Sequence, residues 1–244
     1  PMGRKRQIDQ SMCNGDLTCL EGLCPAFVSV DGQLSKVSGE IITVLPEKEI
    51  PQPSPTDLVG PFNIIIAGVG GNGIITLGHI LAMAALQEGK GATTLNFTGL
   101  AQKGGGVISH VRLSEHPGII QQPRIPCNGG DLLLAGDLIM ACSDEAVEIL
   151  NSQRSAIVSN TYLQPTAEQI ADGDISYDGQ AMKRLLTQRA KEGSADFFNA
   201  TQLAQQLTGQ SIAANLFLLG YAFQKGQIPL QRETILNAIT LNGA

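Results

Sequence analysis

From residue 62 onward, the chain alternates short apolar runs with longer segments whose apolar residues recur at helical spacing. Residues 62–68, FNIIIAG, form an almost continuous apolar run, which is typical of a strand buried on both faces. Residues 74–89 follow a glycine-rich stretch and predict a helix that Gly89 can end. The apolar positions of that helix are Ile74, Leu77, Leu81, Ala84 and Ala85. Residues 92–97 predict a second strand, so these segments together predict the βαβ unit of a parallel sheet.

The same alternation continues to the end of the chain. Further strands are predicted at residues 106–114, 136–143, 155–160 and 195–200. Further helices are predicted at residues 144–151, 179–193, 201–209, 213–226 and 232–243. Because strands and helices alternate, the sequence predicts an α/β fold over residues 62–244, with a Rossmann-like, mostly parallel sheet flanked by helices.

The part of the chain before residue 62 lacks this alternation of apolar runs and helical repeats. Residues 31–61 contain one possible strand, at 40–45, followed by the proline-rich stretch PEKEIPQPSPTDLVGP, which predicts an extended linker. Residues 1–30 are rich in cysteine and poor in helical periodicity, and they predict a small separate segment. The sequence therefore divides into a Cys-rich segment, a linker and one α/β domain.

The amino-acid composition and net charge exclude some classes of protein. Of the 244 residues, 43% are apolar, which is ample for a packed core. The net charge of −6 and the pI near 5.0 argue against a nucleic-acid partner, because such proteins normally carry a basic surface. No apolar run is long enough to span a membrane, and the N-terminus leads into no signal-peptide core. We expect a cytoplasmic protein whose thiols stay reduced.

The glycine-rich stretch between the first strand and the first helix is the first candidate site. Its residues are Gly68, Gly70, Gly71, Asn72 and Gly73. Glycines at a helix start let backbone N–H groups approach a phosphate, and their spacing matches the dinucleotide fingerprint. That fingerprint also needs an acidic residue at the end of the second strand, which here reads LNFTGL without a carboxylate. A tight turn that packs helix against sheet without any ligand is the alternative.

A second candidate site lies in the stretch TGLAQKGGGVISHVRLS. Gln102, Lys103 and Gly104 begin a glycine run that leads into a strand. Such a loop can lie against a ligand or another domain with Lys103 supplying charge, and the alternative is an exposed basic side chain on a loop. His110 and Arg112 alternate along the following strand, and each is expected to be structural. Cys127 and Cys142 are isolated, and Cys142 is predicted to be a core residue within the strand at 136–143.

Three cysteines, Cys13, Cys19 and Cys24, lie together near the N-terminus, and Pro25 follows the third. A 4Fe–4S cluster needs four thiolates, and in two-cluster ferredoxins a cysteine before proline ligates a second cluster. The spacing differs from the standard ferredoxin pattern, so a zinc ion shared with another segment remains open. In either case the ligand set is incomplete within this chain.

The stretches AGVGGNGIITLGHILAMAA, AQKGGGVISHVRLS and RQIDQSMCNGDLTCLEGLCPAFV together resemble one family. The chain is similar to the gamma domain of 2-oxoacid:ferredoxin oxidoreductases, most of all the long, fused indolepyruvate type. The resemblance implies a parent enzyme that oxidatively decarboxylates 2-oxoacids with thiamine diphosphate and coenzyme A. It implies that electrons leave through 4Fe–4S clusters to ferredoxin. It also implies that the parent is a homo-oligomer whose thiamine-binding domains are the partners of this chain.

The resemblance assigns roles to the candidate residues. It implies that Cys13, Cys19 and Cys24 belong to a ferredoxin-like insert whose first cysteines precede residue 1. It implies that residues 68–73 and 102–105 face the substrate-side domains, near coenzyme A. The family's thiamine-binding pattern has no counterpart here, so we expect the isolated chain to be inactive. The alternatives are a dinucleotide-binding oxidoreductase domain and an interaction module stapled by zinc.

Overall fold

The computed structural model describes residues 50–54, 56–70, 72–98, 105–163 and 175–243. The predicted Cys-rich segment, the strand expected at 40–45 and the residues Gly71, Gln102, Lys103 and Gly104 lie outside these ranges. The described end of the predicted linker contains no helix or strand before Phe62.

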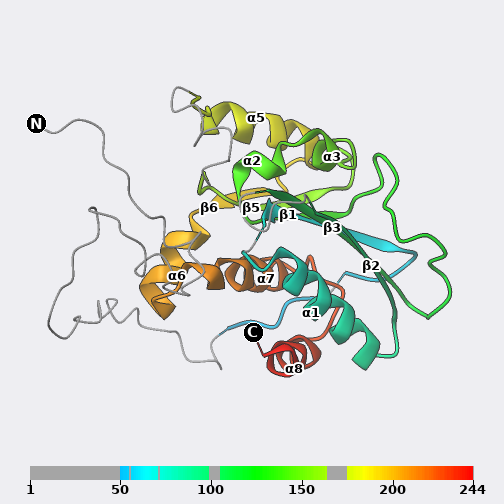
Figure 1. The fold of residues 1–244 in the computed structure, drawn as a ribbon. Helices are drawn as coiled ribbons and strands as arrows, with labels where there is room; N and C mark the ends of the chain where they lie inside the picture. The colour runs from blue at the N-terminus through cyan, green and yellow to red at the C-terminus, as the bar shows by residue number, and fades with distance from the viewer. Residues whose placement is uncertain (1–49, 55, 71, 99–104, 164–174, 244) are drawn as a thin grey trace, which may run out of the picture.

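The described strands form one six-stranded sheet in the order β2-β3-β1-β4-β5-β6 (Figure 1). Strands β1, β4, β5 and β6 run parallel to one another, and β3 runs antiparallel to both β1 and β2. The predicted α/β fold with a mostly parallel sheet is therefore confirmed. The strands are β1 Phe62–Val69, β2 Gly91–Thr98, β3 Gly106–Ser114, β4 Leu132–Ala135, β5 Ala156–Asn160 and β6 Ala195–Phe198.

The first predicted βαβ unit differs from the expectation because a third strand lies between its two strands. Strand β2 does not pair with β1, because β3 lies between them and pairs with both. Residues 99–105 connect β2 to β3, and a parallel pair needs a connection of roughly a dozen residues or more. The short connection therefore makes β2 and β3 an antiparallel pair. Strand β3 is buried along almost its whole length, as its central position requires.

One predicted strand is wrong. Residues 136–143 were expected to form a buried strand, but the strand is β4, immediately upstream, and helix α2, Leu138–Ala141, follows it. The carboxylate of Asp137 accepts a hydrogen bond from the backbone N of Met140 at 2.8 Å and so begins the helix. Cys142 is consequently not a core strand residue but the half-buried residue that ends α2.

The other helices occur close to their predicted positions, except that the helix expected at 144–151 is shorter. They are α1 Ile74–Gln87, α3 Asp144–Val147, α5 Gly179–Arg189, α6 Ala200–Thr208, α7 Ala214–Gln224 and α8 Arg232–Asn242. A 3₁₀ turn, Ser211–Ala213, precedes α7. None of the helices in the described ranges is long and apolar enough to cross a membrane.

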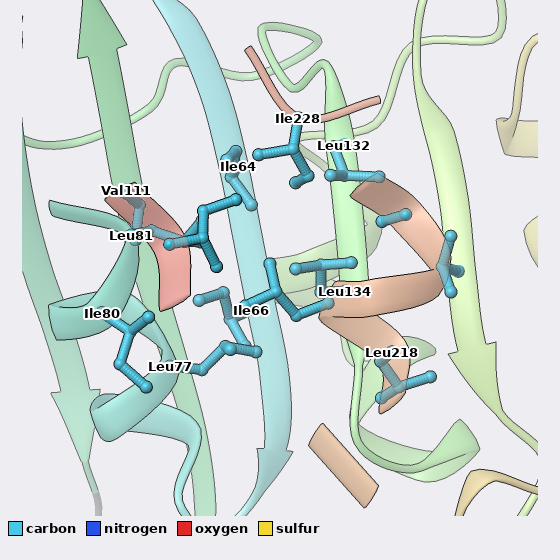
Figure 2. Packing of buried hydrophobic residues seen from close by; sticks show 14 of the residues in the cluster. Ile64, Ile66, Leu77, Ile80, Leu81, Val111, Leu132, Leu134, Leu218 and Ile228 are labelled. Atoms are coloured by element: carbon cyan, nitrogen blue, oxygen red, sulfur yellow. The ribbon is translucent and has the colours of Figure 1, made fainter. Parts of the chain in front are cut away.

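Two helical layers cover the two faces of the sheet (Figure 1). Helices α1, α6, α7 and α8 pack on one face, where Leu77 and Leu81 of α1 lie over Ile66 and Ile64 of β1 (Figure 2). Helices α2, α3 and α5 pack on the other face, against Ile65 and its neighbours. Successive residues of β1 thus enter opposite cores, which explains why the run FNIIIAG is continuously apolar.

Two long-range contacts hold the ends of the domain together. Pro51 and Thr56 contact the end of α7, where the side-chain amide of Gln224 donates to the carbonyl of Pro51 at 2.6 Å and the hydroxyl of Thr56 donates to the carbonyl of Gly226 at 2.7 Å. Glu88, just beyond α1, accepts hydrogen bonds from Lys90 and from the backbone N of Gln231, both at 2.7 Å.

Glu88 serves as a cap for α8. Gln231 is the N-cap residue of α8 and makes no capping bond with its own side chain, and Thr234 of the first turn contacts the same Glu88 oxygen. The carboxylate therefore has the role that Glu plays in a capping box, although it comes from the other end of the chain. Burial raises the pKa of Glu88, but the contacts with Lys90, Thr234 and Gln231 outweigh it and leave the pKa below its usual value of 4.5.

We predict that Glu88→Ala lowers the free energy of unfolding by about 1–2 kcal/mol at pH 7, because the N-cap N–H of α8 and the half-buried hydroxyl of Thr234 lose their acceptor. A group with a lowered folded pKa stabilises above its unfolded pKa and loses this effect as the pH falls. The cost of the substitution should therefore shrink below pH 4.5. Urea unfolding at several pH values measures it. Glu192→Ala, at an exposed position, is the control, and an equal loss in both variants would contradict the capping role.

Candidate functional site

The glycine turn lies where the chain leaves β1 and β4 toward opposite faces of the sheet (Figure 1). After β1 the chain enters α1 on one face, and after β4 it enters α2 on the other. In open α/β sheets, ligands bind at such a point, beyond the carboxyl ends of the strands. The position predicted from the sequence is therefore a topological switch point of the sheet.

Gly68, Gly70 and Gly73 each have a different structural role in the turn. A Cβ at Gly68 would collide with the side chain of Ile74, so this glycine allows α1 to pack tightly against β1. The backbone N–H of Gly70 donates to the carbonyl of Gly105 at 2.7 Å. Gly73 has φ +80°, a left-handed conformation that glycine adopts freely, and it precedes the first residue of α1. The turn is thus tied to the end of the second glycine loop.

Two side-chain amides, those of Asn160 and Asn215, hold the backbone around the turn in place. Asn215, at the start of α7, donates to the carbonyl of Asn72. Asn160, at the end of β5, donates to the carbonyl of Gly136 at 2.9 Å and to Thr201 at 2.8 Å. Asn160 also accepts from the backbone N of Ala200 at 3.1 Å. The sequence analysis missed these asparagines, although an Asn at the end of an apolar run was an available signal.

The geometry at the turn disfavours a dinucleotide. The hollow beside Asn72, Gly136 and Asn215 has a volume of about 20 Å³, which is room for about one water molecule. The N–H of Gly70 is already bonded to Gly105. The strand that would carry the ribose-binding carboxylate is the neighbour of β1 in dinucleotide-binding folds, whereas here β3 separates β2 from β1. Close helix–sheet packing therefore accounts for the described glycines.

A larger hollow, of about 510 Å³, flanks both ends of the loop formed by residues 99–104. Thr98 and Gly106 line it at the two ends of that loop, and Met140 and Ile149 form part of its apolar wall. The Arg124 guanidinium lies 5.7 Å from the ring centroid of Phe97, which itself tilts against His110 at 5.1 Å. The volume of this hollow falls in the range of small-molecule sites, and its lining residues Thr98 and Gly106 flank the predicted Gln102–Gly104 stretch in sequence.

His110 and Arg112 are structural, as predicted. His110 accepts a hydrogen bond through Nδ1 from the backbone N of Ile125 at 3.0 Å. Arg112 donates to Asn63 at 2.8 Å and to the carbonyl of Gln122 at 2.6 Å. These bonds hold the segment between β3 and β4 against the sheet. Burial, followed by the charges of Arg124 and Arg112, lowers the pKa of His110 to about 4, so the ring is neutral at physiological pH.

Asp137 is a buried carboxylate beside the turn. Only 2% of it is exposed, and its Oδ2 atom makes no hydrogen bond within the described residues. A Cβ at Gly68 would lie 3.6 Å from this oxygen, which places it against the end of β1. Burial raises the pKa of Asp137 to about 6, although the backbone amides of Met140, Val69 and Ile139 favour the ionised form.

Among the described residues, no three His, Cys, Asp or Glu side chains lie close enough together to bind a metal ion. Cys127 is exposed and Cys142 is half-buried, and burial, together with the nearby Asp137, raises the pKa of the Cys142 thiol to about 11. A high thiol pKa disfavours the thiolate that metals require. The predicted metal ligands, Cys13, Cys19 and Cys24, lie outside the described residues.

Comparison with known proteins gives consistent matches. Residues 63–243 match the pyruvate ferredoxin/flavodoxin oxidoreductase family. Indolepyruvate oxidoreductase subunit IorB of Methanothermobacter thermautotrophicus is 30% identical over 183 residues, covering 74% of this chain and 87% of that protein.

Two solved structures share the fold. Pyruvate oxidoreductase subunit PORC of Thermotoga maritima has a TM-score of 0.52 and 20% identity, covering 75% of this chain and 85% of that one. The 2-oxoglutarate:ferredoxin oxidoreductase of Magnetococcus marinus, solved with 2-oxoglutarate, coenzyme A and succinyl-CoA, has a TM-score of 0.51 and 17% identity. That match covers 74% of this chain and 27% of the Magnetococcus chain.

We predict that Asp137→Asn stabilises the domain increasingly as the pH rises. A carboxylate whose folded pKa lies at about 6, above its usual 3.8, stabilises the fold below 3.8 and loses this effect as the pH rises through 6. The variant should therefore gain about 2.4 kcal/mol relative to the wild type between pH 4 and pH 7.5. Urea unfolding at both pH values measures the gain, and Asp144→Asn on α3 controls for net charge. A pH-independent difference would contradict the burial argument.

Proposed function

The chain belongs to the pyruvate ferredoxin/flavodoxin oxidoreductase family, and from this premise we propose that it is the gamma domain of an enzyme that oxidises indolepyruvate-type 2-oxoacids. The observation that carries the proposal is the match over residues 63–243, joined to the 30% identity with an IorB subunit over most of both chains. In this proposal the parent enzyme removes carbon dioxide from the 2-oxoacid and transfers the acyl group to coenzyme A. The two electrons released leave one at a time toward ferredoxin.

Within that enzyme the chain binds and positions rather than performing the chemistry. The buried His110 is used to hold a loop, and Asp137 begins a helix. His110 lines the 510 Å³ hollow, where its Nδ1 atom already accepts a hydrogen bond from the backbone N of Ile125, and neither group lines the small hollow beside the glycine turn. The thiamine-binding pattern of the family is absent from the sequence. The thiamine diphosphate and the general chemistry of decarboxylation therefore come from the partner domains.

The contribution to coenzyme A lies at the second glycine loop. Lys103 supplies a positive charge for a phosphate group, with Gln102 and Gly104 as its neighbours in sequence. The 510 Å³ hollow at the two ends of this loop offers space for a group the size of an aromatic ring. The hydrogen bond from the backbone N–H of Gly70 to the carbonyl of Gly105 holds the end of this loop against the first turn. The chain thus forms one wall of a site that another subunit completes.

The electron-transfer contribution rests on Cys13, Cys19 and Cys24. These thiolates suit iron–sulfur ligation, and the cluster supplies one-electron transfer when it is bound. The described cysteines do not compete for this role, because Cys127 and Cys142 lie in no group of metal-ligating side chains. The remaining ligands come from elsewhere in the enzyme.

We predict that the isolated chain does not reduce a viologen dye with indolepyruvate and coenzyme A, whereas the enzyme assembled with its thiamine-binding partner does. Anaerobic assays with and without that partner measure the difference. Turnover by the pure chain would contradict the division of labour. Assembly without activity on any aryl pyruvate would contradict the proposed substrate class.

We predict that replacing Cys13, Cys19 and Cys24 together with serine lowers the iron and acid-labile sulfide of the assembled enzyme and slows ferredoxin reduction by at least about tenfold, because cluster ligation needs thiolates. The same assay on Cys127→Ser should show unchanged iron, since this exposed thiol belongs to the α/β domain. Zinc in place of iron in the wild-type enzyme would instead support the zinc-stapled module.

A further inference from the structure

The edge of the sheet at β6 has no neighbouring strand on its outer side among the described residues (Figure 1). On its inner side, the carbonyl of Ser194 accepts a hydrogen bond from the backbone N of Ile157. Four residues later, the carbonyl of Phe198 accepts one from the backbone N of Thr161. Because the direction of these groups alternates along a strand, the backbone N–H and C=O of Phe197 face outward. Such an edge is suited to one more strand.

An apolar groove of about 740 Å³ lies beside this edge, between β6, α6 and α7. The rings of Phe198 and Tyr221 tilt against each other in its wall, with 4.9 Å between their centroids. Tyr221 and Leu203 are each 36% exposed. The charged residue of the groove, Asp196, already forms an ion pair with Lys225 at 3.3 Å. The groove therefore offers an aromatic and aliphatic surface to an apolar occupant, and its apolar lining includes Phe197, Phe198, Leu203, Leu216, Phe217 and Tyr221.

The N-terminal end of the described chain is tied down next to this groove. The side chain of Gln224, at the end of α7, donates to the carbonyl of Pro51 at 2.6 Å. The next residue, Lys225, is the one that pairs with Asp196 of β6. Tyr221, about one helical turn earlier on α7, lines the groove. Pro51 is therefore held at the turn of α7 that reaches the first residues of β6.

The stretch that precedes this tether has the composition of a buried strand. Residues 41–45, IITVL, belong to the strand predicted at 40–45 and lie outside the described ranges. They include four β-branched residues and no charge, which favours a strand. Alternate side chains of a strand face opposite sides, and each side of this one carries two aliphatic residues. A strand that is apolar on both sides needs cover on both faces, which the helix layers of this sheet provide.

We propose that residues 40–45 pair with β6 as an added edge strand and fill the apolar groove. The six residues from Leu45 to Pro51 span up to about 20 Å when extended, which lets the chain return from its tether to the edge. The tether lies near the first residues of β6, so the added strand extends from there toward the carboxyl end of β6 as it is followed back to residue 40. It therefore runs antiparallel to β6, as edge strands of otherwise parallel sheets often do.

The tether favours this segment over a strand from another molecule. Pairing with residues 40–45 is intramolecular, and a short connection gives the segment a high effective concentration at the edge. A second copy must instead bind from solution, and two chains that each carry a net charge of −6 repel each other. The added strand would also bring residue 40 to the carboxyl end of the sheet, where the glycine turn lies. The inference concerns packing within the chain and does not depend on the proposed function.

The test uses the full chain and substitutes one residue on each side of the contact. Val44→Asp places a charge in the segment, whereas Gly220→Lys places a long charged side chain in the groove. A Cβ at Gly220 meets no atom within 4 Å, and a glycine inside a helix is unfavourable, so the fold tolerates this substitution. Val59→Asp is the matched control, because it makes the same change at a position that is 98% exposed.

Hydrogen exchange at the amide of Phe197 reports the pairing, because this N–H faces the outer edge. In the wild type it should exchange at least about 100-fold more slowly than in Val44→Asp or Gly220→Lys. Val59→Asp should change the rate less than about threefold. The amides of β5 should keep their protection in all three variants, which separates loss of the added strand from loss of the fold.

Two kinds of result would overturn the proposal. One is rapid exchange of the Phe197 amide in the wild type, or protection that Val44→Asp or Gly220→Lys leaves intact. The other is protection with a different source. If it rises with protein concentration, the edge belongs to a second copy, and if it appears only with the thiamine-binding partner, the edge belongs to that subunit.

Discussion

The requirement that β1 be buried on both faces governs the arrangement of this domain. Ile64 and Ile66 enter one core and Ile65 enters the other, so helices must cover the sheet on both sides. The chain meets this requirement by leaving β1 toward one face and β4 toward the other. That divergence opens the sheet at the carboxyl ends of these two strands. The glycine turn, the end of the second glycine loop and the start of α2 all converge there because of it.

The glycine turn shows that one sequence spacing can serve two physical purposes. In a dinucleotide fold the glycines free backbone N–H groups for a pyrophosphate. Here the N–H of Gly70 is bonded to Gly105, and Gly68 lets Ile74 approach β1 closely. Asn215 closes the turn through the carbonyl of Asn72. The described glycines therefore keep the turn compact and tie it to the end of the neighbouring loop.

Sequence patterns predicted the elements whose burial follows a simple repeat. The run at 62–68 became β1 because nearly every position is buried, and the repeat at 74–89 became α1 because its buried positions recur at helical spacing. The prediction of a strand around Gly136 failed because two similar apolar runs lie on either side of this glycine. The capping hydrogen bond of Asp137 makes the second run helical. The amides of Asn160 and Asn215 were likewise invisible, since their partners lie far away in sequence. Pairing of β3 between β1 and β2 depends on connection length, which an apolar pattern does not report.

The two buried titratable side chains of His110 and Asp137 act on stability in opposite directions. His110 has a folded pKa of about 4 against a usual 6.5, so the stability it contributes is present above 6.5 and is lost as the pH falls toward 4. Asp137 has a folded pKa of about 6 against a usual 3.8, so its contribution is present below 3.8 and is lost as the pH rises toward 6. The two windows overlap and have similar widths, so the effects largely cancel between pH 4 and 6. The wild-type pH profile would then hide these two opposing effects, and replacing either residue exposes the effect of the other.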